Sequence, residues 1–426
     1  MVRFWGISDN SAMRRIEVKQ LDYYLTPVGG LALVGHYLKA LAPQWAGLDR
    51  VLPVRGGVSN SDMLRSYLGR LVQGKSDFDA VENYRGDKLF KEALGIGLLP
   101  SSPTLRQRLD RQAAALFEHV PGMIEGLLRS QRPDYGVLPC GWVPLDADTF
   151  AMDNGGTRKE GVGRTYAEVD GNSPLAAHPG AHGSCVELSL RPGVQHSARE
   201  TDFKLERVIP MAQRLSAAGP RAPILARLDS GFDTAALLAR LDAEPGTQWQ
   251  KPRQGKRVAV WEEVIQIEGT RRPLCRVLRL VERDIDRRGQ QLIVPEIELQ
   301  GWTISLPPEQ FTADKIIALY ADHGTHEQFH SKFKTDLDLE RLPSGKFDTN
   351  YLVGQLAALA MNVLHLMGQH GLLGPDAPVR HPAIYGVRFC KHTLQSMGSG
   401  LQVYRVYVSC SPCSPEGQVL QSRTLD

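Results

Sequence analysis

The sequence predicts an α/β protein with a helical N-terminal region and a β-rich insertion. Apolar residues from about 30 to 130 recur at helical spacing. Further along, two apolar strand-like runs each end in an acid and are followed by helical segments, which is typical of an α/β core. Residues 248–305 alternate like strands and show no long helical period.

The composition is that of an ordinary globular protein. The 426 residues include 42% apolar and 23% charged residues, which suggests two or three domains. The net charge of +3 indicates no polyanion partner unless the cations cluster. Six scattered cysteines and an N-terminal apolar run that stops at Ser8 predict a cytoplasmic protein without a disulfide scaffold.

Changes in residue pattern divide the chain into four parts. We expect a helical region at 1–135 and an α/β core built from 136–247 and 306–372. The β-rich, basic insertion at 248–305 interrupts this core, and the segment at 373–426 would form a dimerisation element or a tail.

Several short helices are predicted in the N-terminal region. Four apolar residues share one helix face: Leu64, Leu68, Leu71 and Val72. Further helices are expected at 77–84 and 88–94, and Ser102 before Pro103 predicts the start of a helix that carries Arg106. The three helices would suit a helix-turn-helix in which Arg106 contacts DNA; a solvated face on an ordinary bundle is the alternative.

The core is predicted from two apolar runs that lead to acids. Residues 138–145 read as a buried strand that delivers Asp146 and Asp148, and residues 223–228 as a strand that leads to Asp229 and a helix at 234–241. Other strands are expected around 164–169 and 185–190, with a helix at 201–215.

The insertion and the last apolar segment have distinct patterns. Strands are expected at 258–261, 264–267 and 292–294, and residues 251–290 contain eleven Lys or Arg against six Asp or Glu. This excess suits a phosphate backbone, although a solvated charged surface explains it equally well. Within 351–373, Gln355, Asn362 and Gln369 recur every seven residues, which predicts a core helix with a polar stripe rather than a membrane span.

Three distant acids could form a metal site. The carboxyl ends of strands converge at one edge of an open sheet, so Asp148 and Asp229 could meet there, and a neighbouring helix could add Glu327. Three carboxylates would hold two Mg²⁺ ions, with Mn²⁺ as a substitute, for phosphodiester chemistry. Asp146 shares a strand face with Asp148 and is a rival for the first acid.

The stretch from Tyr320 to Lys334 carries the third acid. Tyr320, Glu327 and Lys334 follow at intervals of seven residues. If the stretch is helical, Glu327 and Lys334 lie on one face two turns apart, and Lys334 could reach a phosphate near the metals.

These blocks resemble the RNase H-like DDE transposases of bacterial insertion sequences, whose signature is Y-x-x-R-x-x-x-E followed by Lys seven residues later. The likeness runs from about 57 to 370. It implies that Asp148, Asp229 and Glu327 bind the metals and that Tyr320 and Lys334 contact phosphate. His323 replaces the Arg of the signature, and a neutral imidazole cannot reproduce a bidentate guanidinium clamp, so reduced activity and a tolerated variant both remain open.

The resemblance also implies a reaction and partners. The expected activity is Mg²⁺-dependent DNA cleavage and strand transfer through a hairpin end, by a homodimer that binds terminal inverted repeats and target DNA. Trp302 would stack on a flipped base, although a core tryptophan is an equal alternative. A catalytically silent DNA-binding protein and a nuclease without strand transfer are the competing functions.

Two weaker metal-binding patterns lie outside these blocks. Cys410 and Cys413, with Cys390 and His392, could hold a zinc ion, although their spacing is irregular. His326 and His330 are four residues apart on the expected helix and could form a metal-binding pair.

Overall fold

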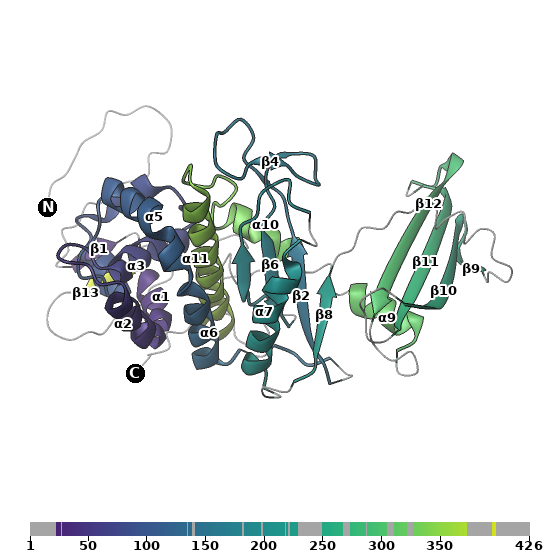
Figure 1. Cartoon of the computed structure of the whole chain (residues 1–426), viewed down its shortest axis with the longest axis horizontal. Helices are drawn as coiled ribbons and strands as arrows, with labels where there is room; N and C mark the ends of the chain where they lie inside the picture. Colours follow the sequence, from purple (N-terminus) through teal and green to yellow (C-terminus); the bar gives the residue numbers. More distant parts are fainter. Residues whose placement is uncertain are drawn as a thin grey trace, which may run out of the picture. The chain divides into compact units, whose positions relative to one another are not determined.

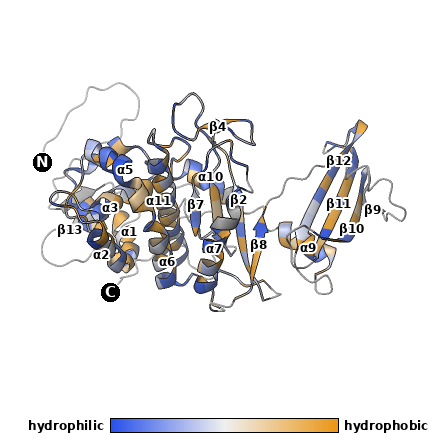
Figure 2. Cartoon of the chain, viewed as in Figure 1, coloured by the Kyte–Doolittle hydropathy of each residue, from blue (hydrophilic) through white to orange (hydrophobic). Residues whose placement is uncertain are grey.

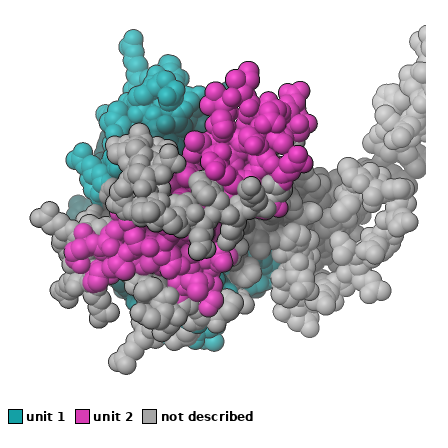
Figure 3. Space-filling view, turned by 90° about the vertical axis from the view of Figure 1, so that its right-hand side faces the viewer, with its two compact units in different colours: residues 1–225, 329–426 teal, residues 226–328 magenta. Residues whose placement is uncertain are grey.

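The computed structural model describes residues 23–26, 28–133, 135–138, 141–180, 183–196, 199–217, 219, 222–228, 249–266, 273–286, 288–304, 311–321, 327–372 and 394–397. The chain forms two compact units, one of residues 1–225 with 329–426 and the other of residues 226–328 (Figure 3). The predicted helix at 234–241, His323, His326 and all four zinc candidates lie outside the described residues.

A four-stranded sheet forms the centre of the first unit. Its strands are β2 (Val143–Thr149), β6 (Leu175–Pro179), β7 (Glu187–Ser189) and β8 (Ile224–Leu228), in the order β7-β6-β2-β8. The first three are antiparallel neighbours, and helix α7 (Thr201–Leu215) then leads to β8 on the far side of β2. This order confirms the predicted RNase H-like sheet flanked by helices, and α7 matches its predicted bounds.

The strand that carries the acids begins later than predicted. Leu138, Gly141 and Trp142 are not part of a strand: the Leu138 amide donates to the Trp142 carbonyl at 2.8 Å, and Gly141 adopts a left-handed φ of 83°. Strand β2 therefore starts at Val143, and Asp146 and Asp148 lie within it rather than beyond its end.

Two further differences concern the strands that follow β2. The strand predicted around 164–169 is wrong, because Thr165 and Val169 close a turn between β4 (Gly163–Arg164) and β5 (Asp170–Asn172). These strands and β3 (Met152–Asp153) form a small sheet of order β3-β5-β4. Strand β6, next to β2 in the main sheet, was not predicted.

Helices fill the N-terminal region, as the sequence predicts. They are α1 (Leu31–Leu38), η1 (Lys39–Leu41), α2 (Ala42–Val51), α3 (Asn60–Leu71), η2 (Phe78–Tyr84), α4 (Lys88–Leu94), α5 (Ser102–Phe117) and α6 (Val120–Gln131). The predicted apolar face of α3 is fully buried. The cap of α5 is Ser101, whose hydroxyl accepts from the Thr104 amide, so Ser102 is already helical. Strand β1 (Tyr23–Thr26) pairs with β13 (Leu394–Met397).

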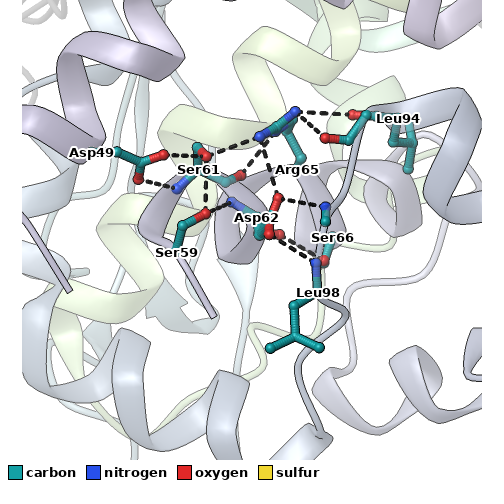
Figure 4. A network of polar contacts seen from close by, with 10 residues as sticks. Asp49, Ser59, Ser61, Asp62, Arg65, Ser66, Leu94 and Leu98 are labelled. Atoms are coloured by element: carbon teal, nitrogen blue, oxygen red, sulfur yellow. Dashed lines mark hydrogen bonds and ion pairs between the residues drawn. The ribbon is translucent and has the colours of Figure 1, made fainter. Parts of the chain in front are cut away.

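A buried polar network holds the start of α3 (Figure 4). The Asp62 carboxylate accepts hydrogen bonds from the Gly97 and Leu98 amides at 3.1 and 2.9 Å, and Arg65 Nη2 lies 3.3 Å from it. Ser61 donates its hydroxyl to Asp49 at 2.6 Å. Because these partners are charged, the hydrogen bonds tie α3 to α2 and to the loop before α5 more firmly than neutral ones would.

Helix α11 (Phe347–Leu366) lies between the N-terminal helices and the sheet (Figure 1) and is largely apolar (Figure 2). Residues Phe347–His370 form the one described helical stretch that is long and apolar enough to cross a membrane, and 94% of its apolar window is buried in the protein. This agrees with the predicted core helix, which continues into the π-helical turn η4 (Met367–Leu372).

The predicted polar stripe of α11 binds the edge of the sheet. Asn362 accepts from the Cys185 amide at 2.8 Å and donates to the Cys185 carbonyl at 2.7 Å. Gln355 donates to the Leu188 carbonyl at 2.9 Å. These side chains therefore pair the backbone of edge strand β7 and the residues before it, which would otherwise be buried without partners.

The second unit contains the predicted β-rich insertion. Strands β9 (Trp249–Arg253), β10 (Lys256–Ile265), β11 (Leu274–Ile285) and β12 (Gln291–Ile304) form an antiparallel sheet in sequence order, followed by helix α9 (Ala313–Ala321). Three of its arginines form cross-strand ion pairs: Arg257 with Glu282, Arg276 with Glu263, and Arg283 with Glu296 and Glu298. Three of the eleven basic residues between 251 and 290 are therefore paired with acids on a neighbouring strand.

Candidate functional site

Strand β2 presents its acids on one face of the sheet. Asp146 and Asp148 alternate with Leu145 and Ala147, which are buried on the opposite face. On the acidic face, His178 of β6 is the direct cross-strand partner of Asp146. The strand thus separates a hydrophobic side from a side that holds titratable groups.

Helix α7 covers the hydrophobic face. Glu187 of β7 is fully buried and forms an ion pair with Arg207 of α7. The strand register places Glu187 on the same face as Ala147. The acidic face therefore lies on the side of the sheet away from α7.

Helix α10 (Glu327–Thr335) packs on the acidic face. The ring of Phe329 lies 5.2 Å from that of His178, and the imidazole of His330 stacks on Phe150 at 4.6 Å with an interplanar angle of 16°. His330 Nδ1 lies 3.8 Å from Asp148 Oδ2. Aromatic packing thus holds the helix that begins with Glu327 against the strand that carries the first acids.

Solvent access separates the two candidates for the first acid. Asp146 is 1% exposed, whereas the side chain of Asp148 is 20% exposed. Asp148 Oδ1 accepts from the Thr149 amide at 2.6 Å, which holds one of the two carboxylate oxygens. A hydrated cation and a DNA strand need an accessible oxygen, so this geometry favours Asp148.

For Asp229 and Glu327, the structure gives only the position of the strand or helix beside or within which each residue lies. Asp229 directly follows β8, the strand next to β2, but is itself outside the described residues. Glu327 is the first residue of α10, one turn before His330, and its side chain is not described. Among the side chains that are described, no three His, Cys, Asp or Glu residues form a metal-binding group.

Lys334 lies beside the end of β2. Its Nζ is 5.8 Å from the centre of the Phe150 ring and 3.9 Å from Glu340 Oε2. The other oxygen of Glu340 accepts from the Asp153 amide at 2.7 Å. Lys334 is 28% exposed, so its ammonium group is accessible beside the acidic strand, as a phosphate contact requires.

The second unit brings together two of the predicted DNA contacts. Trp302 of β12 and Tyr320 of α9 lie edge to face with ring centres 6.1 Å apart. Both side chains are half-buried, and an indole in this position is neither a fully buried core residue nor a free surface residue.

Arg106 lies on the outer side of α5. Its guanidinium is 48% exposed, 3.7 Å from Asp79 and 5.5 Å from the centre of the Phe78 ring. The opposite side of α5 is buried through Leu105 and Leu109. Contact of Arg106 with DNA remains a prediction.

Sequence reasoning missed Lys332, a buried lysine on α10. The residue is 5% exposed, and its Nζ lies 4.9 Å from the centre of the Phe329 ring. Burial lowers the pKa of Lys332 to about 8, although the nearby Asp336 acts in the opposite direction. Its place between apolar positions of a short amphipathic helix was the only sequence signal.

This burial predicts a pH-dependent stability. Because an unfolded lysine titrates near pH 10.4, the folded chain binds fewer protons than the unfolded chain between about pH 8 and 10. The free energy of unfolding should therefore gain up to about 1.4 kcal/mol per pH unit in this window and nothing from Lys332 below it. Urea unfolding at pH 8 and pH 10 should show this gain in the wild type and not in Lys332→Met.

The control for this measurement is Lys75→Met, which removes the same charge from an exposed turn. It should retain the wild-type difference between pH 8 and pH 10. Equal pH dependence in wild type and Lys332→Met would show that the Lys332 ammonium is as well solvated in the folded chain as in the unfolded chain.

The strand order, and acids on β2 and directly after β8, define an RNase H-like α/β domain. Residues 53–250 match the family model described as the transposase DDE domain, group 1, so this part of the chain is a DDE transposase domain. The matched residues include Asp148 and Asp229 and end before the stretch from Tyr320 to Lys334.

Comparisons with curated proteins and with solved structures do not extend this assignment. No curated protein matches the chain. Among solved structures, the chain is similar to piggyBac transposase in a cryo-EM synaptic complex with hairpin DNA, with 11% identity and a TM-score of 0.35, over 85% of this chain and 79% of that one. A likeness at this TM-score supports no conclusion about the site.

Proposed function

We propose that this transposase performs metal-dependent cleavage and strand transfer of the DNA of an insertion sequence. The observation that carries the proposal is the accessible Asp148 on β2, beside the strand that leads to Asp229 and facing the helix that begins at Glu327. Acids supplied by two adjacent strands and by a neighbouring helix suit phosphodiester chemistry.

The acids of the proposed site fit Mg²⁺, with Mn²⁺ as a substitute. Mg²⁺ prefers carboxylate oxygens and retains several waters, and Asp148 offers an oriented and partly exposed carboxylate. Asp148, Asp229 and Glu327 would hold a metal pair, with Asp146 behind them as a buried neighbour. When bound, such a pair activates a nucleophile and stabilises a departing 3′-oxygen.

The remaining residues would bind and orient DNA. Lys334 and Tyr320 would contact phosphates, and His323 would occupy the third position of the same signature. Trp302 would stack on an extruded base beside Tyr320. Arg106, on the exposed side of α5, would contact the transposon end.

The proposed partners are the terminal inverted repeats of the element and a target duplex, bound by a homodimer in the bacterial cytoplasm at the nucleoid. The freed 3′-OH would attack the opposite strand to form a hairpin. Two alternatives remain: a catalytically silent protein that binds the ends, and a nuclease that cuts without joining.

The test uses the full-length protein and labelled duplexes that carry the DNA flanking its own reading frame on each side. Incubation with Mg²⁺ should yield nicked, hairpin and joined products, and none with EDTA. Binding without cutting would establish the silent alternative and overturn the proposal. Cutting without hairpin or joined products would establish the nuclease.

A further inference from the structure

Phe150 connects the acidic strand to helix α10. It lies two residues after Asp148 and is 4% exposed. Its ring stacks on His330, and Lys334, one turn later on α10, lies 5.8 Å from the ring centre. Phe150 thus contacts two successive turns of α10, and this contact sets the distance between the helix and the strand.

His330 also faces the first acid. Its imidazole is 5% exposed, and Nδ1 lies 3.8 Å from Asp148 Oδ2. This distance exceeds that of a direct hydrogen bond and lies within ion-pair range whenever the imidazole is protonated. On the other side, the His178 ring lies 6.0 Å away. The His330 imidazole therefore packs against the Phe150 ring and also lies near the Asp148 carboxylate.

We propose that His330 is a positioning residue for the proposed metal site: its imidazole, stacked on Phe150, orients the Asp148 carboxylate. This inference rests on the proposed function. Residues that orient ligand carboxylates from behind commonly change metal affinity or activity by about 10- to 100-fold when they are replaced.

Two variants separate the polar role of His330 from its packing role. His330→Phe keeps an aromatic ring on Phe150 and removes both nitrogens. His330→Asn gives up the stack but places an amide N–H near the position of Nδ1. His36→Phe, at an exposed histidine of α1, is the matched control.

The first readout is Mn²⁺ binding to the DNA-free protein by calorimetry, and the second is the single-turnover cleavage rate at saturating DNA. His330→Phe should bind Mn²⁺ and cleave about 10- to 100-fold less well, with unchanged DNA affinity and unfolding midpoint. His330→Asn should lie closer to the wild type in Mn²⁺ affinity, and His36→Phe should equal it.

The results that would contradict the positioning role of His330 differ from those that would contradict the proposed function. Wild-type Mn²⁺ affinity in His330→Phe, or an Asn variant no better than the Phe variant, overturns the positioning role. Loss of one bound Mn²⁺ per chain would make His330 a ligand and would also overturn it. If the wild type binds Mn²⁺ but cleaves no DNA, the proposed function fails, while the Mn²⁺ titrations still decide the role of His330.

Discussion

Asp148→Asn is expected to lower the rate of DNA cleavage by about 10³-fold or more, because it removes one charged oxygen ligand from the proposed metal pair. Stabilisation of transition-state charge by a bound metal is worth several kcal/mol, and each 1.4 kcal/mol is a factor of ten. Asparagine keeps the size of the side chain, so the unfolding midpoint should stay near the wild-type value. Single-turnover cleavage of labelled end DNA measures the effect.

Asp146→Asn is the matched control for this experiment. Asp146 lies on the same strand face but is 1% exposed, so its replacement should leave the cleavage rate within about tenfold of the wild type. The reverse pattern, with Asp146→Asn inactive and Asp148→Asn active, would assign the first acid to Asp146. Equal activity of all three proteins would contradict the metal site itself.

Asn362→Leu is expected to destabilise the fold by about 2 to 5 kcal/mol. The replacement removes both hydrogen bonds to Cys185 and leaves a buried amide and a buried carbonyl unpaired, at roughly 1 to 3 kcal/mol each. Chemical unfolding followed by circular dichroism measures the loss.

The control is Met361→Leu, one residue earlier on α11 and also fully buried. This swap conserves volume and removes no hydrogen bond, so it should cost less than about 1.5 kcal/mol. A cost for Asn362→Leu no larger than for Met361→Leu would mean that water or another group replaces the lost amide.

Helices were predicted more accurately than strands. The bounds of α4 and α7 match the prediction because each helix is set by local apolar spacing. Strand β6 has the sequence Leu-Ala-Ala-His-Pro, which has little β propensity. It is a strand because it pairs with β2 on one side and β7 on the other, and these partners come from other parts of the chain.

The charge pairing within the insertion was also not predictable from the sequence. The sequence shows an excess of basic residues between 251 and 290, which suits a phosphate backbone. Only the strand register reveals that Arg283 lies opposite Glu296, and that Arg257 and Arg276 have acids on the neighbouring strand. A count of charges along the chain cannot predict these ion pairs, because the pairs depend on which residues face each other across neighbouring strands.

The sequence by itself determined the class of the protein, because residues 53–250 match the transposase DDE domain. It also determined the core helix, whose polar residues recur every seven positions. Only the tertiary structure distinguished the accessible Asp148 from the buried Asp146, and only it placed His330 and Phe150 beside them. Burial and contact depend on what packs against a strand face, and here the packing helix lies about 180 residues further along the chain.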